Sequence, residues 1–522
     1  MKHYFSHKMS IVNGQSSLWT WAVAIMLGLT ACYSDDSTVA DQLLPDITIS
    51  GLDDSGYSVI SFADNYLDIT ADVKTAYPES ELDCRWYLID RQAQYGTQDE
   101  DHPYEWEQIA EGKTLHYNVR LAPGEYEVVM VVTAANGYSV SKKVPLFVTT
   151  EFSEGYYILK ETPDGNTELD LCNPETGLHL QNCLTARNGH PMDGAPEAVS
   201  TTISQGYIDD VTNTMATSNI VTVTTRNRQI SVMRTSDLKE VMNNSNLLFT
   251  RFDDDEIPYS IVQCMWCNIL ITNKGIRSQY QASLDKGESG RYGITNGIHT
   301  SRYAAYERES RGLFLWDPEN RNVVCCDYNG TVRPGTKEEN DLSTMNVYDC
   351  LYIGYCDAST DVVYVLRHRS GLLWVMTIKG GFASGWKMQE LKPIKAYAPN
   401  VSMANKFSVC TTQATLLYGI NNGRIWAYDF INNNEREITP DGISDNETIT
   451  YVSDHYVGRQ ENSYFVVGTQ QGSNYTLRFY RNFGGQPDGQ AVCTVSGTGL
   501  VRGLRYTTNN SMQSYQQAGL MD

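Results

Sequence analysis

Short segments in which apolar and polar residues alternate make up the chain from about residue 46 to residue 150. They cover 46–49, 66–71, 83–89, 114–119, 124–132 and 140–149. Alternation with period two predicts strands that have one buried and one solvent-facing side. Strands at this spacing, divided by turn residues, indicate a β-sandwich over 46–150, with Trp86 filling the space between its sheets.

A different pattern begins near residue 150, where Asn, Thr, Gly and Tyr become more frequent. A polar turn followed by an apolar strand recurs at about fifty-residue intervals, in the segments 164–171, 228–232, 274–276, 312–317, 371–375, 423–429 and 475–479. This period, with short strands and almost no helical pattern, predicts a β-propeller of about seven blades over 151–522. Two successive β-sandwiches are the alternative. The best candidate for a short helix is 235–243, so the predicted fold class is all-β.

The first 32 residues have the features of a secretory leader. Lys2 and Lys8 precede an apolar stretch over 18–29, which is short for a membrane span. The sequence Leu-Thr-Ala-Cys at 29–32 matches the pattern in which the cysteine is acylated. We therefore predict a signal peptide over 1–31, lipidation of Cys32, and a flexible tether over 32–45.

Three further segments carry a family resemblance. The acidic run YSDDS at 33–37 resembles the surface-export signal of Bacteroidetes lipoproteins, and the strand around Trp86 with the segment LAPGEY at 121–126 resembles a PKD-type immunoglobulin-like domain. The junction GYYILK at 155–160 precedes an Asp-Gly-Asn turn. With the lipidation pattern, these segments make the chain similar to the PKD-like family lipoproteins of the Bacteroidetes.

The resemblance implies an outer-membrane protein that is held by its acyl chains and faces the cell exterior. Such proteins are commonly seen beside nutrient-uptake receptor pairs, so the resemblance implies uptake receptors as partners and a glycan or peptide as ligand. The net charge of −22 repels phosphate backbones, and we expect no nucleic-acid partner.

The cysteines do not suggest a disulfide framework. Of the 12 cysteines, 11 remain once Cys32 is acylated, and this odd number is scattered along the chain. Cys264 and Cys267 have CxxC spacing, but they lie in an apolar strand pattern without a second ligand pair, and Cys325 and Cys326 are similar. We interpret these as buried free thiols.

Motifs for a nucleophile, a zinc ion, a phosphate or calcium are absent from the sequence, and we predict no catalytic residues, metal or cofactor. The acidic run 253–256 has the composition of a calcium site, but a solvated loop is the preferred interpretation. His368 is a candidate for a propeller channel, although a hydrogen-bonded strand histidine is the preferred interpretation.

Aromatic residues give the more useful signal, because the chain has 34 Tyr and 9 Trp against 13 Phe. Such amphipathic rings suit sugar rings and protein partners. Trp316, Trp374 and Trp426 occupy equivalent positions in the repeats, which indicates packing between blades. The predicted rim of a binding site is instead made of residues in Gly/Ser-rich stretches: Tyr303, Tyr306, Phe382 and Trp386.

The leading hypothesis is a non-catalytic surface lipoprotein that binds a glycan, peptide or protein for an outer-membrane uptake system. A glycan lyase or hydrolase with its acids in the propeller channel is the second hypothesis, because the fold supports catalysis in other proteins. A structural or adhesive surface subunit is the third.

Overall fold

The computed structural model describes residues 46–61, 66–90, 106–121, 123–211, 213–264, 267–280, 290–294, 298–307, 312–327, 331–339, 347–381, 385–455 and 464–508. The leader, the lipidation site Cys32 and the tether predicted over 1–45 lie outside these residues. Strands fill most of the described part, whose one α-helix is α3 (Cys183–Asn188), so the all-β class is confirmed. No described helix combines the length and apolar character needed to cross a membrane.

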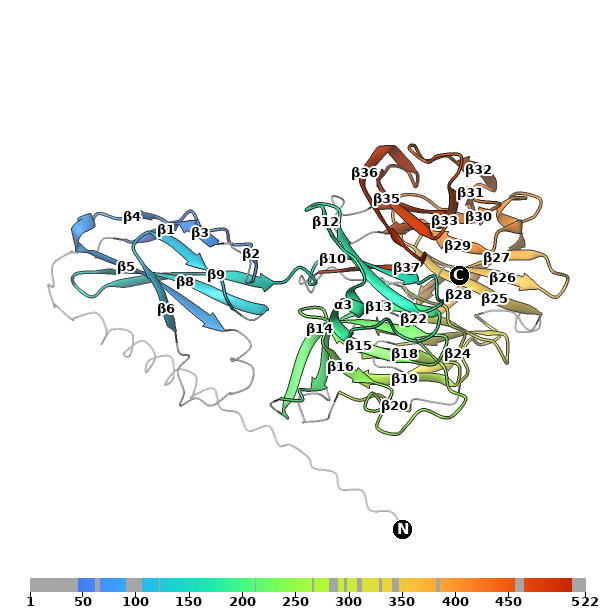
Figure 1. Ribbon diagram of the computed structural model, residues 1–522, viewed down its shortest axis with the longest axis horizontal. Helices are drawn as coiled ribbons and strands as arrows, with labels where there is room; N and C mark the ends of the chain where they lie inside the picture. Colours follow the sequence, from blue (N-terminus) through green and yellow to red (C-terminus); the bar gives the residue numbers. More distant parts are fainter. Residues whose placement is uncertain are drawn as a thin grey trace, which may run out of the picture.

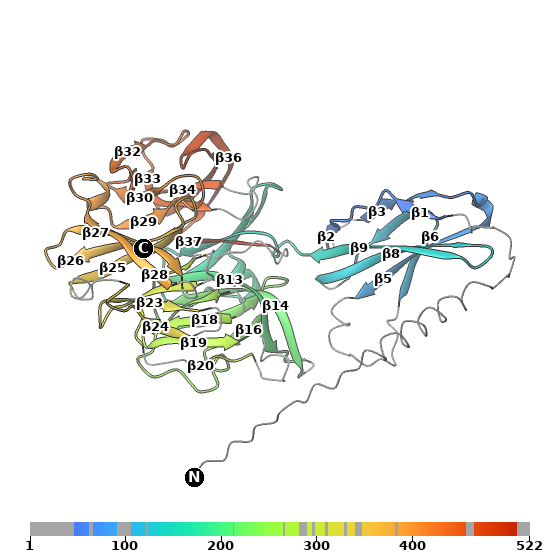
Figure 2. The same ribbon diagram turned by 180° about the vertical axis from the view of Figure 1, so that it is seen from behind.

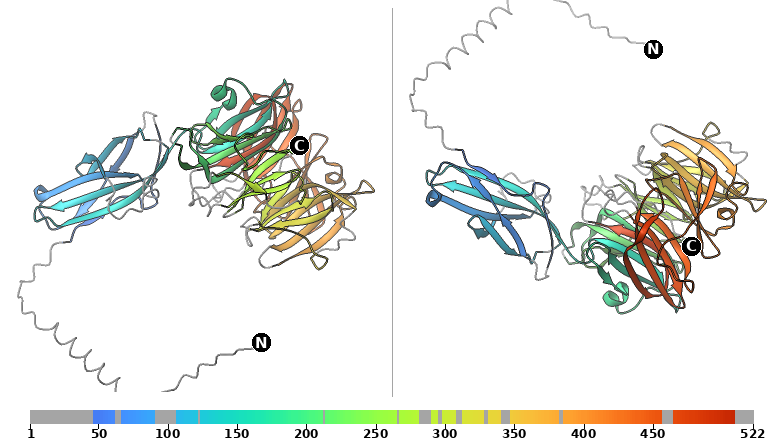
Figure 3. Two further views of the ribbon diagram at one scale, coloured as in Figure 1. Left: turned by 90° about the horizontal axis from the view of Figure 1, so that it is seen from below. Right: turned by 90° about the horizontal axis from the view of Figure 1, so that it is seen from above.

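The strands form two groups, joined by the chain between β9 and β10, and the two groups lie apart in every view (Figures 1, 2 and 3). The first group has the strand order β2-β9-β8-β5-β6 in one sheet, with two-stranded sheets β1-β4 and β3-β7. Its strands are β1 (Thr48–Ser50), β2 (Tyr57–Ile60), β3 (Tyr66–Thr70), β4 (Asp72–Lys74), β5 (Leu82–Asp90), β6 (Glu107–Glu111), β7 (Thr114–Asn118), β8 (Gly124–Ala134) and β9 (Ser139–Thr149).

One hydrophobic core holds this group together. It contains Leu67 and Leu115 from the small sheets and Trp86, Val128 and Leu146 from the five-stranded sheet, so the sheets pack face to face. Trp86 is fully buried, and its indole N–H donates to the carbonyl oxygen of Gly112 at 2.9 Å, which satisfies the one polar atom of the side chain. Trp86 therefore lies in the apolar core that these sheets share.

The second group consists of seven four-stranded antiparallel sheets in the described residues, numbered here 1 to 7 in chain order. Sheets 1 to 3 contain β10 (Gly155–Glu161), β11 (Thr167–Asn173), β12 (Leu178–Leu180) and β37 (Leu500–Thr507); β13 (Pro196–Ile208), β14 (Met215–Thr225), β15 (Ile230–Arg234) and β16 (Glu240–Asn243); and β17 (Pro258–Cys264), β18 (Cys267–Thr272), β19 (Gly275–Tyr280) and β20 (Gly293–Ile294).

Sheets 4 to 7 follow the same order along the chain. They contain β21 (Ala304–Glu307), β22 (Gly312–Asp317), β23 (Asn322–Cys326) and β24 (Val332–Pro334); β25 (Tyr348–Cys356), β26 (Asp361–His368), β27 (Leu373–Gly381) and β28 (Gly385–Pro393); β29 (Lys406–Val409), β30 (Leu416–Asn421), β31 (Arg424–Asp429) and β32 (Asn434–Ile438); and β33 (Thr448–His455), β34 (Tyr464–Gln471), β35 (Asn474–Asn482) and β36 (Pro487–Thr498).

The last strand closes the ring of sheets. In sheets 2 to 7 the strands lie in chain order, whereas in sheet 1 the order is β12-β11-β10-β37. The strand β37, from the end of the described chain, pairs antiparallel with β10, so that Gly155 lies opposite Thr507. It thus takes the place that the first strand holds in the other sheets. This closure is typical of a propeller-like domain.

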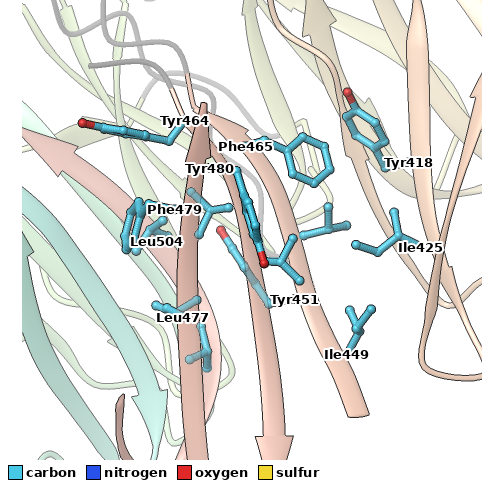
Figure 4. Close-up of a cluster of buried hydrophobic side chains, with 14 of the residues drawn as sticks. Tyr418, Ile425, Ile449, Tyr451, Tyr464, Phe465, Leu477, Phe479, Tyr480 and Leu504 are labelled. Carbon is cyan, nitrogen blue, oxygen red and sulfur yellow. The ribbon is translucent and has the colours of Figure 1, made fainter. Parts of the chain in front are cut away.

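Apolar clusters between successive sheets form the core of the ring. Each cluster joins neighbouring sheets, and the one that includes Tyr418, Tyr451 and Phe479 joins sheets 6 and 7 to sheet 1 (Figure 4). Strands such as β18 and β22 are buried at every position, because both faces of their sheet pack against another sheet. The propeller-like fold is therefore supported by the packing as well as by the strand order.

Two sequence predictions about this domain are wrong. The segment 312–317 is the second strand of sheet 4, whereas the other recurring segments contribute to third strands, so Trp316 is not equivalent to Trp374 and Trp426. The helix predicted over 235–243 is a turn followed by β16, because that segment completes sheet 2 by pairing with β15. Tertiary pairing overrides a weak helical pattern there.

Candidate functional site

The first strands of the sheets, with β37 in that role for sheet 1, lie side by side around the axis of the propeller-like domain. Contacts connect β13 to β17, β21 to β25, β25 to β29, β29 to β33, β33 to β37, and β37 back to β13. Strands far apart in the sequence therefore lie around one axis. We call this region the channel.

Tyr352 comes into the channel from β25 in sheet 5. The strand has a register shift between Cys350 and Tyr352, and the ring lies over Gly354, where an added Cβ would stand 2.7 Å from the phenol oxygen. This oxygen accepts the N–H of Val409 on β29 at 3.2 Å. Burial raises the pKa of Tyr352 to about 12, so the phenol is protonated at neutral pH and can donate a hydrogen bond.

Tyr451 comes into the channel from β33 in sheet 7, and Figure 4 shows it within the core cluster of sheets 6, 7 and 1. A register shift between Ile449 and Tyr451 also precedes this tyrosine, and a Cβ at Gly468 would stand 2.8 Å from the tyrosine Cβ. Burial raises the pKa of Tyr451 to about 12, against smaller opposing effects of Ser453 and of Arg505. This phenol is also protonated at neutral pH.

Arg505 lies on β37 and is half-buried. Burial lowers the pKa of its guanidinium, while Tyr451 and Tyr352 raise it. Arginine nevertheless stays charged in proteins. The three side chains come from sheets 5, 7 and 1 and lie close enough to shift one another's pKa values. We call Tyr352, Tyr451 and Arg505 the channel cluster.

His455 and Asp454 lie at the end of β33, next to the channel cluster. Burial, followed by the charge of Arg505, lowers the pKa of His455 to about 3, and its ring meets Tyr156 edge-on at 5.5 Å. Its buried Nε2 has no hydrogen-bond partner among the described residues. Burial raises the pKa of Asp454, whose carboxyl oxygens accept the backbone N–H of Thr411 at 2.7 Å and the amide of Asn482 at 2.6 Å.

A second charged group lies at the beginning of the first strands. Glu197 on β13 is buried, and Arg302, just before β21, approaches it at 3.1 Å while lying 5.9 Å from the ring centre of Tyr259. Arg226 also approaches Glu197, at 3.6 Å. Glu197 is therefore neutralised by side chains of sheets 2 and 4.

The predicted rim residues have different positions from those expected. Tyr306 and Trp386 are only 3% and 4% exposed and belong to core clusters, because β21 and β28 continue the sheets through stretches that the sequence suggested were loops. They are therefore wrong as rim residues. Phe382 lies outside the described residues. Tyr303 is partly exposed and its ring meets that of Tyr352 at 6.4 Å, next to the channel cluster.

The other chemical candidates of the sequence have structural roles. His368 ends β26, a second strand, and its Nδ1 lies 2.8 Å from the hydroxyl of Ser370. In the acidic run 253–256, Glu256 is buried against Arg277, with a bidentate pairing at 2.7 and 2.9 Å, so the solvated-loop interpretation fails for that residue. No described His, Cys, Asp or Glu residues form a group suited to a metal ion.

The described cysteines are free, and most are buried. Cys264 and Cys267 lie opposite each other in the pairing of β17 with β18, and burial raises the pKa of both thiols. The prediction of buried free thiols is confirmed for these two and for Cys325 and Cys326. A shallow groove on the first group of sheets is lined by Glu79, Asp83, Glu111 and Lys113, of which Lys113 pairs with Glu79.

The sequence reasoning missed the channel cluster entirely. A usable signal was present, since the first strands of sheets 5 and 7 share a tyrosine, a β-branched residue and a small residue, in Tyr-Ile-Gly at 352–354 and Tyr-Val-Ser at 451–453. Alignment of the repeats on their first strands would have exposed these tyrosines. Arg505 has no such signal, because its place beside them depends on ring closure by β37.

Comparisons with known proteins give similarity to solved structures only. No family model and no curated protein matches the chain. A protein of unknown function from Bacteroides thetaiotaomicron is 10% identical over 84% of this chain and 96% of its own, with a TM-score of 0.31. A DUF4784 family protein from Bacteroides caccae is 10% identical over 77% and 97%, with a TM-score of 0.31. Virginiamycin B lyase from Staphylococcus aureus is 14% identical over 61% and 92%, with a TM-score of 0.32.

Proposed function

We propose that this protein is a non-catalytic binding protein of the bacterial cell envelope, which holds a small ligand in the channel of its propeller-like domain. The observation that carries the proposal is the channel cluster. Tyr352, Tyr451 and Arg505 come from three sheets and bring two phenols and one permanent cation together at the axis. Ligand sites characteristically have a largely apolar lining with a few convergent polar groups.

The protonation states in the channel favour binding over catalysis. A general base works best with a pKa near the operating pH, whereas the pKa of His455 is lowered to about 3 and those of Tyr352 and Tyr451 are raised to about 12. A hydrolase acting on glycosides needs two carboxyl groups, and Asp454 already accepts two hydrogen bonds from its own fold. A glycan lyase or hydrolase remains the alternative function, and formation of product from a glycan would establish it.

The remaining parts of the chain fit a role at the cell surface. We propose that residues 46–150 form an immunoglobulin-like module of the PKD type, which spaces the propeller-like domain from the membrane. Acylation of Cys32 would hold the protein in the outer membrane, facing outward, beside uptake receptors that receive the ligand. Trp86 in a core between packed sheets and the lipidation pattern at 29–32 support this part of the proposal.

The test is a ligand screen with the soluble form, residues 46–522, which contains every described strand. Thermal shift against host and dietary glycans and peptides measures binding, because a ligand that binds only the folded state raises the midpoint. Each hit is incubated with the protein and followed by chromatography for product. A shift without turnover supports the proposal, turnover establishes the enzyme, and no shift with any compound favours a structural subunit.

A further inference from the structure

The chain between β9 and β10 connects two groups of sheets whose described strands lie apart (Figures 1 and 2). Domains that share only a small interface normally move relative to each other. Flexible linkers are rich in Gly and Ser, which leave the backbone torsions free. The segment Thr-Glu-Phe-Ser-Glu at 150–154 contains no Gly, and hydrogen bonds hold its two ends to different groups of sheets.

The peptide group between Thr149 and Thr150 is held from both sides. Its carbonyl oxygen, on Thr149, accepts the N–H of Ser61, which follows β2 in the first group, at 2.8 Å. The hydroxyl of Thr149 also donates to the carbonyl oxygen of Val59 on β2 at 3.3 Å. The N–H of the peptide group, on Thr150, donates to the hydroxyl oxygen of Ser153 at 3.1 Å, in the turn that leads into β10. Because a peptide group is planar, these bonds fix the torsion angles on either side of it.

The hydroxyl of Thr150 connects this turn to sheet 2. It donates to the carbonyl oxygen of Ser236, between β15 and β16, at 2.8 Å. It accepts the N–H of Phe152 at 3.2 Å and lies 3.1 Å from the hydroxyl of Ser153, so one donor and two acceptor positions are filled. The N–H of Ser153 returns to the carbonyl oxygen of Thr150 at 3.1 Å. Ser153 is only 1% exposed, and hydrogen bonds away from water are stronger.

The rest of the segment is attached to sheet 1. The carbonyl oxygen of Phe152 accepts the hydroxyl of Tyr157 at 2.7 Å, and the ring of Phe152 packs against the apolar cluster of sheets 1 and 2. The carboxylate of Glu154 accepts the hydroxyl of Tyr506, on β37, at 3.0 Å. Within 150–154, only Glu151 has none of these contacts, so this described segment leaves no stretch of free backbone between the two groups.

We infer that the segment 149–154 is a rigid joint, which makes the first group of sheets and the propeller-like domain move as one body. The inference concerns the mechanics of the chain and goes beyond the proposed function without depending on it. With the proposed anchor at Cys32, the first group would act as a spacer of constant length and angle, and flexibility would be confined to the tether that precedes it.

Double electron–electron resonance measures the distribution of distances between two nitroxide labels in the soluble form, residues 46–522. The labels are attached to p-acetylphenylalanine, because the free native cysteines would compete for a thiol-reactive label. One pair of labels spans the joint, at Asp54 and Asp210, whose side chains are 80% and 70% exposed. The reference pair lies within the propeller-like domain, at Asp210 and Arg424, whose side chain is 66% exposed.

The test variant combines Thr150→Val with Ser153→Ala, which removes both hydroxyls of the turn with little change in volume. Thr150→Ser is the conservative variant, because it keeps the hydroxyl. The matched control combines Thr133→Val with Ser139→Ala and removes a pair of hydroxyls that lie 2.8 Å apart. This pair joins β8 to β9 at the opposite end of β9 from the joint.

In the wild type, the pair of labels that spans the joint should give a single distance distribution as narrow as that of the reference pair. Thr150→Val with Ser153→Ala should broaden it at least about twofold, because the freed torsions allow the two groups to move independently. Thr150→Ser and the control should leave the width unchanged. If the test variant does not fold, as judged by circular dichroism, the comparison of the two label pairs in the wild type decides the question.

A broad or two-peaked distribution across the joint in the wild type overturns the inference, because it shows a hinge. An unchanged width in the test variant, or equal broadening in the control, overturns the assignment of the rigidity to these hydrogen bonds. None of these outcomes depends on a ligand, so the joint and the proposed binding function are tested separately.

Discussion

The buried ion pair between Lys160 and Asp170 offers the sharpest test of how the ring is closed. Lys160 on β10 and Asp170 on β11 are 1% and 0% exposed, with Nζ and Oδ1 2.8 Å apart. The carboxylate also accepts the backbone N–H of Asn182 at 2.7 Å and the hydroxyl of Tyr475 on β35. The pair therefore joins sheet 1 to sheet 7, next to the strand that closes the ring.

Asp170→Asn should destabilise the propeller-like domain by about 3–5 kcal/mol, because it leaves the Lys160 ammonium buried without its counter-ion. Lys160→Met leaves a carboxylate that still accepts from Asn182 and Tyr475, so its cost should lie at the lower end of that range. In the double variant both charges are absent. Its loss of unfolding free energy should therefore be smaller than the sum of the losses of the two single variants by about 1–3 kcal/mol.

Urea unfolding monitored by tryptophan fluorescence measures these free energies, and Lys274→Met is the control. Lys274 pairs with Asp255, which is 72% exposed, so its substitution should change the free energy of unfolding little, because solvent screens exposed pairs. The reasoning is refuted if Asp170→Asn costs no more than Lys274→Met, or if the two single costs simply add in the double variant.

Three further predictions concern the channel and the response to acid. Gly354→Ala should weaken ligand binding and lower the free energy of unfolding by about 1–3 kcal/mol, because the new Cβ would lie 2.7 Å from the phenol oxygen of Tyr352. The control is Gly293→Ala, where a Cβ meets open space; this variant should change neither the affinity measured by calorimetry nor the midpoint of urea unfolding. The pKa of Glu447 is lowered from 4.5 to about 2, because hydrogen bonds from Arg478 and Thr469 outweigh the opposing effect of burial. The charged carboxylate therefore stabilises the fold by about 3 kcal/mol above pH 4.5, and this stabilisation is lost as the pH falls through 2. Glu447→Gln should flatten urea stability in that window, and an unchanged slope would contradict the assignment. The pKa of His455 is lowered from 6.5 to about 3, so the unfolded chain binds a proton before the folded one and stability should fall from pH 6.5 toward 3; His455→Gln should lack this component of the slope.

Sequence reasoning found the class and the repeat because both depend on local patterns. Alternation over 83–89 and the recurring turn-and-strand segments correspond to β5 and to strands of the seven sheets. The repeat was assigned to the wrong strand of sheet 4 at 312–317. There, a glycine followed by an apolar strand forms the second strand, and the third strand begins only at Asn322. Nothing local distinguishes two adjacent strands that are buried on both faces.

The site could not be found in the same way. Tyr306 and Trp386 have loop-like neighbours in the sequence, yet both are core residues, since β21 and β28 pair with neighbouring strands and these two side chains pack into the apolar clusters between sheets. Arg505 looks like any strand arginine in the sequence. Its position on the strand that closes the ring depends on long-range pairing, since closure brings β37 beside β33 and β10, and closure is a property of the whole chain.

Hydrogen–deuterium exchange with and without the ligand found in the screen tests the central claim most directly, because it locates the site without any substitution. If the ligand binds in the channel, protection should appear in peptides from β25, β33 and β37, which carry Tyr352, Tyr451 and Arg505. Protection confined to outer strands of the sheets or to the first group, β1–β9, would contradict a channel site.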